Sequence, residues 1–137
     1  MTIEKYLGKW IMDTSRSNYQ LGDPPQKGTY DIIQEDDRLV FLMDWVDQAG
    51  DQKQMSFSEI CDGEFHPYHN SPAVDEIQLQ LMDGPILQSL AKKDGIIIME
   101  AQRELLSEQL MKVTMGGPLP DGSSYQNISF YEKPATD

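Results

Sequence analysis

The sequence has a single cysteine, few basic residues and no long apolar run. Cys61 is the only cysteine, so no disulfide forms within the chain and nothing indicates an oxidising compartment. No apolar stretch approaches the roughly 20 residues of a membrane-spanning helix, which argues against membrane insertion. The residues up to Tyr6 lack the basic start and apolar run of a signal peptide, so we expect a cytoplasmic protein.

Basic residues are scarce relative to acidic ones. The chain has 11 Lys and Arg against 23 Asp and Glu, which gives a formal net charge of −12. Such a charge repels phosphate backbones and anionic headgroups, so nucleic acids and anionic membrane surfaces are excluded as natural partners. The acidic residues are spread along the chain, and a solvated surface accounts for them.

Residue patterns typical of catalysis or cofactor binding are also missing. No serine lies in a nucleophile-elbow pattern, and Gly116-Gly117-Pro118 carries a proline where a phosphate-binding loop needs free amides. The two histidines, in His66-Pro67-Tyr68-His69, have no cysteine partner at a metal-ligand spacing. We therefore predict no catalytic residue, no metal and no cofactor. An isomerase-like or hydrolase-like enzyme stays open, because a fold does not fix a function.

Turn signals divide the chain into short segments of strand length. Repeated short strands separated by regular turns are typical of an all-β sandwich or barrel made of hairpins. The signals are Gly22-Asp23-Pro24-Pro25, Glu35-Asp36-Asp37, Gln48-Ala49-Gly50-Asp51, Asp62-Gly63, Asp83-Gly84-Pro85, Asp94-Gly95, and Gly116-Gly117-Pro118 through Asp121-Gly122.

Several of these segments alternate apolar and polar residues with a period of two. The clearest is 77–81, and 111–115 and the last segment, with Ile128 and Phe130, repeat the pattern. The segments 39–46 and 95–99 are apolar on both faces, so we expect a lumen, a partner subunit or the end of the barrel to cover their second face. The pattern as a whole predicts strands with one wet face.

One segment has the composition of a helix. Residues 100–110 are mostly good helix formers, without glycine or proline. The flanking segments are nevertheless strong strand patterns, and a hairpin centred on Ser107-Glu108-Gln109 keeps the regular spacing. We therefore predict a hairpin here rather than a helix.

Short motifs along the chain resemble those of a known protein family. Gly8-Lys9-Trp10, at the start of the first predicted strand, resembles the Gly-x-Trp signature of lipocalins and their calycin relatives. The order of the remaining landmarks is similar to that of small bacterial lipocalin-like proteins of unassigned function. These landmarks are Asp13, Ser15, Ser17, Tyr19, Pro24-Pro25, Thr29, Asp62-Gly63, Pro67, Pro72-Ala73-Val74-Asp75, Lys92-Lys93-Asp94-Gly95, Arg103, Ser107, Met111-Lys112-Val113-Thr114 and Phe130-Tyr131-Glu132-Lys133.

The resemblance implies an up-and-down antiparallel β-barrel of about 8–10 strands, like those of lipocalins and fatty-acid-binding proteins. We expect one domain over residues 1–133 and a short tail at 134–137. Fatty-acid-binding proteins carry a two-helix lid between their first two strands. Only residues 14–27 are available for it here, and they contain Gly22 and two prolines, so we expect no lid.

A barrel of this size encloses either packed side chains or one small ligand. The first reading is non-enzymatic binding of a small apolar or amphipathic molecule. The alternative is a filled barrel that acts as a protein-interaction or self-association domain, which leaves a homo-oligomer open. The predicted ligand-binding residues are Tyr30, Phe41, Met43, Trp45, Met99, Arg103 and Met115.

Arg103 has two candidate roles. The related folds place a basic residue against the early tryptophan, so Gly8, Trp10 and Arg103 are predicted to form the closed end of the barrel, with the guanidinium stacked on the indole. The other reading makes Arg103 the counter-charge for a ligand carboxylate inside the lumen.

Overall fold

The computed structural model describes residues 3–69, 71–83 and 85–134, so most of the expected tail at 134–137 lies outside the described residues. The described residues form eleven β-strands, two short 3-10 helices and no α-helix, and no helix among them could cross a membrane. The elements are η1 (Ile3–Tyr6), β1 (Gly8–Met12), η2 (Thr14–Arg16), β2 (Asn18–Tyr19), β3 (Lys27–Glu35), β4 (Arg38–Val46), β5 (Gln52–Ile60), β6 (Phe65–Pro67), β7 (Glu76–Met82), β8 (Ile86–Lys93), β9 (Ile96–Ser107), β10 (Leu110–Pro118) and β11 (Ser124–Glu132).

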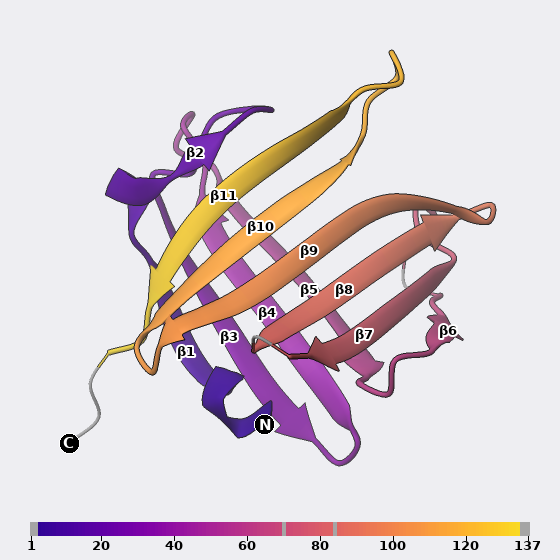
Figure 1. Cartoon of the computed structure of the whole chain (residues 1–137). Helices are drawn as coiled ribbons and strands as arrows, with labels where there is room; N and C mark the ends of the chain where they lie inside the picture. Colours follow the sequence, from indigo (N-terminus) through magenta and orange to yellow (C-terminus); the bar gives the residue numbers. More distant parts are fainter. Residues whose placement is uncertain (1–2, 70, 84, 135–137) are drawn as a thin grey trace.

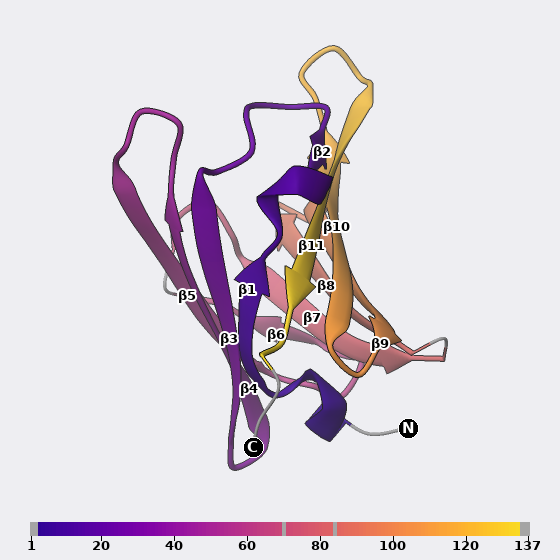
Figure 2. The same ribbon diagram turned by 90° about the vertical axis from the view of Figure 1, so that its left-hand side faces the viewer.

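All strands belong to one antiparallel sheet that curls into a nearly closed barrel (Figure 1). The order is β5-β4-β3-β1-β11-β10-β9-β8-β7-β6, and β2 pairs with β11. Strand β1 joins the two halves of the chain because it pairs with both β3 and β11 (Figure 2). The predicted all-β antiparallel barrel is confirmed.

The barrel interior is built from alternate residues of the strands. Leu79, Leu87 and Met111 are fully buried, and Ile77 and Val113 are nearly so. Their intervening neighbours are more exposed, as the period-two segments predicted. Burying a large apolar side chain contributes roughly 1.5–3 kcal/mol, so this interior supplies most of the driving force for closure.

In the last strand, β11, the residues that point into the barrel are Ser129 and Tyr131, which carry hydroxyl groups, rather than the apolar residues that alternate with them. Ser129 is buried, and the ring of Tyr131 meets that of Tyr30 edge to face with centroids 5.5 Å apart. Phe130 lies under the Arg16 guanidinium of η2, whose Cζ is 5.5 Å from the ring centroid. The lumen therefore carries hydroxyl groups along β11.

The segment with helical composition is a hairpin, as predicted. Strand β9 runs to Ser107, β10 begins at Leu110, and the two strands pair from Glu100 opposite Gly116 to Ser107 opposite Leu110, with one register shift next to the turn. Ala101 and Arg103 are buried in the interior, so a helix would remove both from the core. Tertiary pairing outweighs local propensity here.

Gly116-Gly117-Pro118 was predicted to be part of a turn, and this is wrong. These residues end β10 and pair with β11, and the turn follows at 119–123. The backbone approaches closely at both glycines: a Cβ on Gly116 would lie 2.5 Å from the Tyr125 carbonyl oxygen, and one on Gly117 would lie 2.5 Å from that of Ile98. These two positions need glycine because the neighbouring backbone leaves no room for a Cβ, and not because the chain turns there.

The expectation that the segment 95–99 is covered on both faces is also wrong at its start. Ile96 is 64% exposed and Ile97 is 43% exposed, because they begin β9 next to the Asp94-Gly95 turn. The segment 39–46 forms β4, where Leu39 and Phe41 are buried in the core and Val40 and Leu42 are half-buried.

The closed end of the barrel differs from the predicted pairing of Trp10 with Arg103. Trp10 is fully buried and its Nε1 donates to the Tyr6 carbonyl oxygen at 2.9 Å. The cation over its ring is Lys133, with Nζ 5.0 Å from the centroid. A Cβ on Gly8 would lie 2.9 Å from Lys133 Cε, so the glycine leaves room for that side chain. Arg103 reaches other rings, described below.

The segment available for a lid forms only η2 and β2. Strand β2 pairs with β11, and the hydroxyls of Tyr19 and Ser129 lie 2.9 Å apart. The expected absence of a two-helix lid is confirmed within the described residues.

We predict that Gly117→Ala lowers the free energy of unfolding by about 2 kcal/mol, because the new methyl group meets backbone that side-chain motion cannot relieve. Gly28→Ala is the matched control: this strand glycine has negative φ, and a Cβ there meets its neighbours at ordinary distances of 3.5 Å or more. Urea denaturation of both variants measures the difference. Equal midpoints for the two variants would contradict the close-packing role.

Candidate ligand-binding cavity

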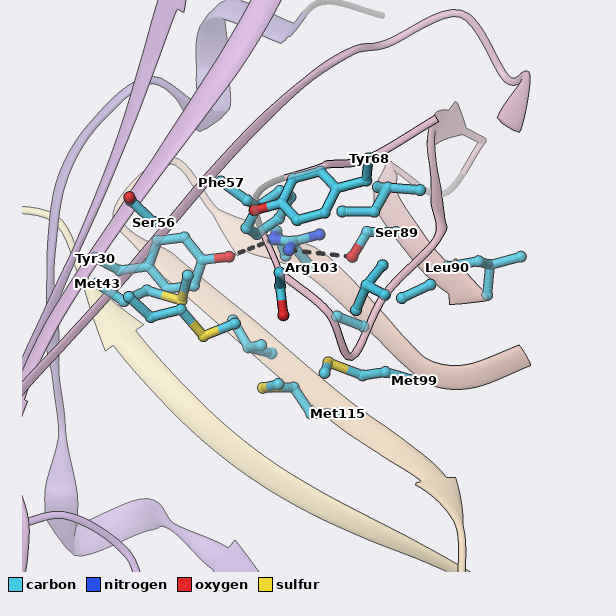
Figure 3. Close-up of a pocket in the computed structure, with 17 residues that line it drawn as sticks. Tyr30, Met43, Ser56, Phe57, Tyr68, Ser89, Leu90, Met99, Arg103 and Met115 are labelled. Atoms are coloured by element: carbon cyan, nitrogen blue, oxygen red, sulfur yellow. Dashed lines mark hydrogen bonds between the residues drawn. The ribbon is translucent and has the colours of Figure 1, made fainter. Parts of the chain in front are cut away.

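A cavity of about 350 Å³, which we call the inner cavity, lies inside the barrel. Its wall comes from β3, β4, β5, β7, β8, β9 and β10 and from Tyr68, Ser71 and Val74 of the β6–β7 connection. Five predicted residues line it: Tyr30, Met43, Met99, Arg103 and Met115. Figure 3 shows Arg103 between Tyr30 and Met43 on one side and Leu90 and Met99 on the other. The role of these residues in binding stays a prediction.

The other two predicted residues lie outside the inner cavity. Phe41 is fully buried in the core, and its ring stacks on that of Phe57 with centroids 4.6 Å apart. Trp45 lines a second cavity, described below. The sequence analysis missed Phe57, Tyr68 and Ser89. Phe57 was within reach, because Met55 and Phe57 alternate with polar neighbours in the same way as the strands that were recognised.

Arg103 is the buried charge of the inner cavity, with only 2% of its surface exposed. Its Nε donates to the Tyr30 hydroxyl at 2.7 Å, Nη1 donates to the Leu87 carbonyl oxygen at 3.3 Å, and Nη2 donates to the Ser89 hydroxyl at 3.3 Å. Side chains two residues apart on a strand point to the same face, and Arg103 and Ala101 of β9 are both buried. The pleat of β9 therefore points Arg103 into the barrel. Three acceptors on two strands, β3 and β8, thus hold the guanidinium in place.

Aromatic rings lie beneath the guanidinium. Cζ of Arg103 lies 4.6 Å from the Phe41 ring centroid and 5.8 Å from that of Tyr30. These two rings meet edge to face at 6.1 Å. Cation–π contacts of this kind contribute about 0.5–2 kcal/mol each and partly replace the lost hydration of the charge.

No carboxylate within the described residues forms an ion pair with Arg103. The buried acid Glu59 pairs with Arg38 instead, with Nη2 and Oε1 3.8 Å apart. Burial raises the pKa of Tyr6 to about 12 and also raises the pKa of Tyr131 well above its ordinary value. Both phenols therefore stay neutral at physiological pH and supply no counter-charge.

The guanidinium retains unused hydrogen-bonding capacity. Three of its five N–H groups are engaged with protein oxygens. The hydroxyls of Tyr30 and Ser89 accept from Arg103, so each can donate its own proton to a further group. The site presents several donors and one positive charge to the cavity, an arrangement that suits an anion such as a carboxylate.

The two histidines lie away from this cavity. His66 Nε2 lies 2.9 Å from both oxygens of the Asp62 carboxylate, and His69 is exposed. Hydrogen bonds from the Glu64 amide and then His66 lower the pKa of Asp62. Across residues 3–69, 71–83 and 85–134, no three Cys, His, Asp or Glu side chains gather in a way that could hold a metal ion.

No family model and no curated protein sequence matches the chain. Solved structures do. Zebrafish ileal bile acid-binding protein in complex with cholic acid is 14% identical, with a TM-score of 0.56 over 95% of this chain and 99% of that one. The siderocalin Ex-FABP is 10% identical, with a TM-score of 0.54 over 97% of this chain and 77% of that one. The chain therefore has a β-barrel fold of the lipocalin and fatty-acid-binding-protein kind.

Proposed function

We propose that this protein binds a small amphipathic molecule, with the apolar body in the inner cavity and an anionic group at Arg103. The observation that carries the proposal is a buried guanidinium that faces an apolar cavity and has no carboxylate partner among the described residues. Two similar barrels support it through their names: one was solved with cholic acid, and the other is a siderocalin with dual ligand specificities.

The energetics favour a binding role over a purely structural one. An unpaired charge inside a protein costs several kcal/mol, and apolar residues of similar volume usually fill such a position at no loss of stability. A bound anion would pair with the guanidinium in surroundings of low dielectric constant, where their attraction is strong. A bound anion would therefore explain why an arginine, rather than an apolar residue, occupies this buried position.

The filled-barrel alternative fits less well, because about 350 Å³ of the lumen is not occupied by side chains. This volume lies at the lower end of the range of about 300–1,000 Å³ for small-molecule sites. Self-association through the outer surface is compatible with a ligand inside the barrel and forms no part of this proposal.

Replacing Arg103 separates binding from folding. We predict that Arg103→Met weakens binding of dodecyl sulfate and dodecanoate at least about tenfold, because a charge-assisted contact worth about 1.5–3 kcal/mol is lost. We expect the melting temperature to change little, because relief of a buried charge offsets the hydrogen bonds and ring contacts that are lost. Displacement of 1-anilinonaphthalene-8-sulfonate fluorescence and thermal melting measure the two effects.

The matched control is Arg16→Met, which removes a half-exposed arginine on the outside of the barrel. It should leave both affinities unchanged. If Arg103→Met bound both anions as tightly as the parent protein, the counter-charge role would be wrong. A large fall in its melting temperature would assign Arg103 to the structure instead.

The raised pKa values of Tyr6 and Tyr131 predict the pH dependence. Neither phenol ionises near Arg103 at neutral pH, so affinity for dodecyl sulfate should be constant between about pH 6 and pH 9. In the unfolded chain both phenols titrate near 10, below their folded pKa values. Their contribution to stability is therefore complete below about pH 10 and is lost as the pH rises through about 12. Melting temperatures of the parent and Tyr6→Phe from pH 8 to 12 check the sign, because the variant should lose less stability at high pH.

A further inference from the structure

A second cavity of about 320 Å³ lies beside the inner one. Met43, Met55 and Met115 line both cavities, from β4, β5 and β10, so these three side chains form the partition between them. The second cavity also reaches Met12 at the end of β1 and the connection between β2 and β3. The lumen is therefore two chambers separated by methionine side chains.

The partition consists of the most adaptable apolar residue. Methionine is unbranched, with three rotatable bonds and a polarisable sulfur, and it repacks around irregular shapes at low cost. Met55 is 42% exposed, so its side chain is not fixed by close packing on all sides. A chain-like ligand longer than one chamber would pass between such side chains without displacing backbone.

The two chambers carry opposite charge. Among the described residues, the inner cavity is lined by Arg103 and by no acidic residue, whereas the second is lined by Asp23, Asp44 and Asp47 and by no Lys, Arg or His. Oδ1 of Asp44 is buried without a hydrogen-bond partner within the described residues. A buried acceptor without a donor is costly, and a ligand group that donates a hydrogen bond would remove that cost.

Aromatic groups complete the second chamber. The side chains of Trp45, Tyr125 and Tyr131 line it together with Ser129 and Asn127. Rings beside carboxylates suit the alkyl part of a ligand and an attached hydroxyl or ammonium group, whereas a second anion would meet three negative charges.

We propose that the second chamber is a subsite of the same lumen, which takes the far end of a ligand whose anionic end lies at Arg103. The ligand class is an amphipathic monoanion, long enough to cross the methionine partition, with a hydroxyl or ammonium group at its far end. A molecule with an anionic group at each end is rejected. This inference rests on the proposed function.

Three probes of equal chain length test the far-end chemistry: hexadecanoic acid, its ω-hydroxy derivative, and the corresponding α,ω-dicarboxylic acid. Displacement titrations at pH 8 should give the ω-hydroxy acid the highest affinity and the dicarboxylic acid an affinity at least about tenfold below it, because the second carboxylate meets like charge. Equal affinities for the ω-hydroxy and dicarboxylic acids would overturn the inference.

Two variants locate the effect. Asp44→Asn should reduce the discrimination against the dicarboxylic acid by at least about threefold. Asp51→Asn should not, because exposed Asp51 lies outside the lining, although its backbone amide donates to the carboxylate of the lining residue Asp47 at 2.9 Å. Thr29→Phe, at a residue that lines the second chamber and not the inner cavity, should fill the second chamber, so that hexadecanoate binding falls while octanoate binding, which needs only the inner cavity, is retained. Unchanged discrimination in Asp44→Asn, or an unchanged length profile in Thr29→Phe, would also overturn it.

The experiment separates this inference from the proposed function. If the parent protein binds none of the monocarboxylates, and Arg103→Met behaves like the parent, the proposed function fails and the subsite fails with it. If monocarboxylates bind through Arg103 but the far end and the partition make no difference, only the second chamber is wrong.

Discussion

The hydrogen bond from Arg103 Nε to the Tyr30 hydroxyl joins two sides of the barrel that lie far apart in the sequence. It brings the end of a long, charged side chain from β9 across to β3, over the face of Phe41 on β4. Contacts with Leu87 and Ser89 on β8 complete its support. Because every acceptor here is neutral, the site keeps its positive charge, and the electrostatics of the inner cavity follow from that.

The two ends of the lumen are packed differently. At the closed end, Trp10 fills the space, its indole N–H is satisfied by the Tyr6 carbonyl, and Lys133 covers the ring. Further along, the methionines of β4, β5 and β10 and the hydroxyls of β11 line the two cavities. A tightly packed end next to a loosely packed one gives a barrel that is stable and still hollow, because the apolar core does not depend on filling the cavity.

Turn spacing and period-two alternation predicted an all-β sandwich or barrel, and the resemblance to lipocalin-like proteins selected the barrel. The alternation also gave the inward face of most strands, but in β11 it is Ser129 that is buried rather than Phe130. Met99, Arg103 and Met115 lie on the cavity because they share faces with buried neighbours, and that follows from the pleat of a strand. The pairing of Trp10 with Arg103 rested on the resemblance alone, and it is wrong because the cation over the Trp10 ring is Lys133. Gly116 and Gly117 have the composition of a turn, and only the approach of Tyr125 and Ile98 explains them.

The placement of charge explains how an acidic protein would bind the anionic ligand that we propose. With a net charge of −12, the surface repels anions at long range, but this repulsion is screened beyond about 10 Å in ordinary salt. Attraction to the proposed ligand must then come from a group inside the barrel, where the dielectric constant is low and no carboxylate of the described residues pairs with Arg103. One arginine in an apolar chamber meets this need, and the acidic residues in the adjoining chamber would restrict the proposed ligand to a single anionic end.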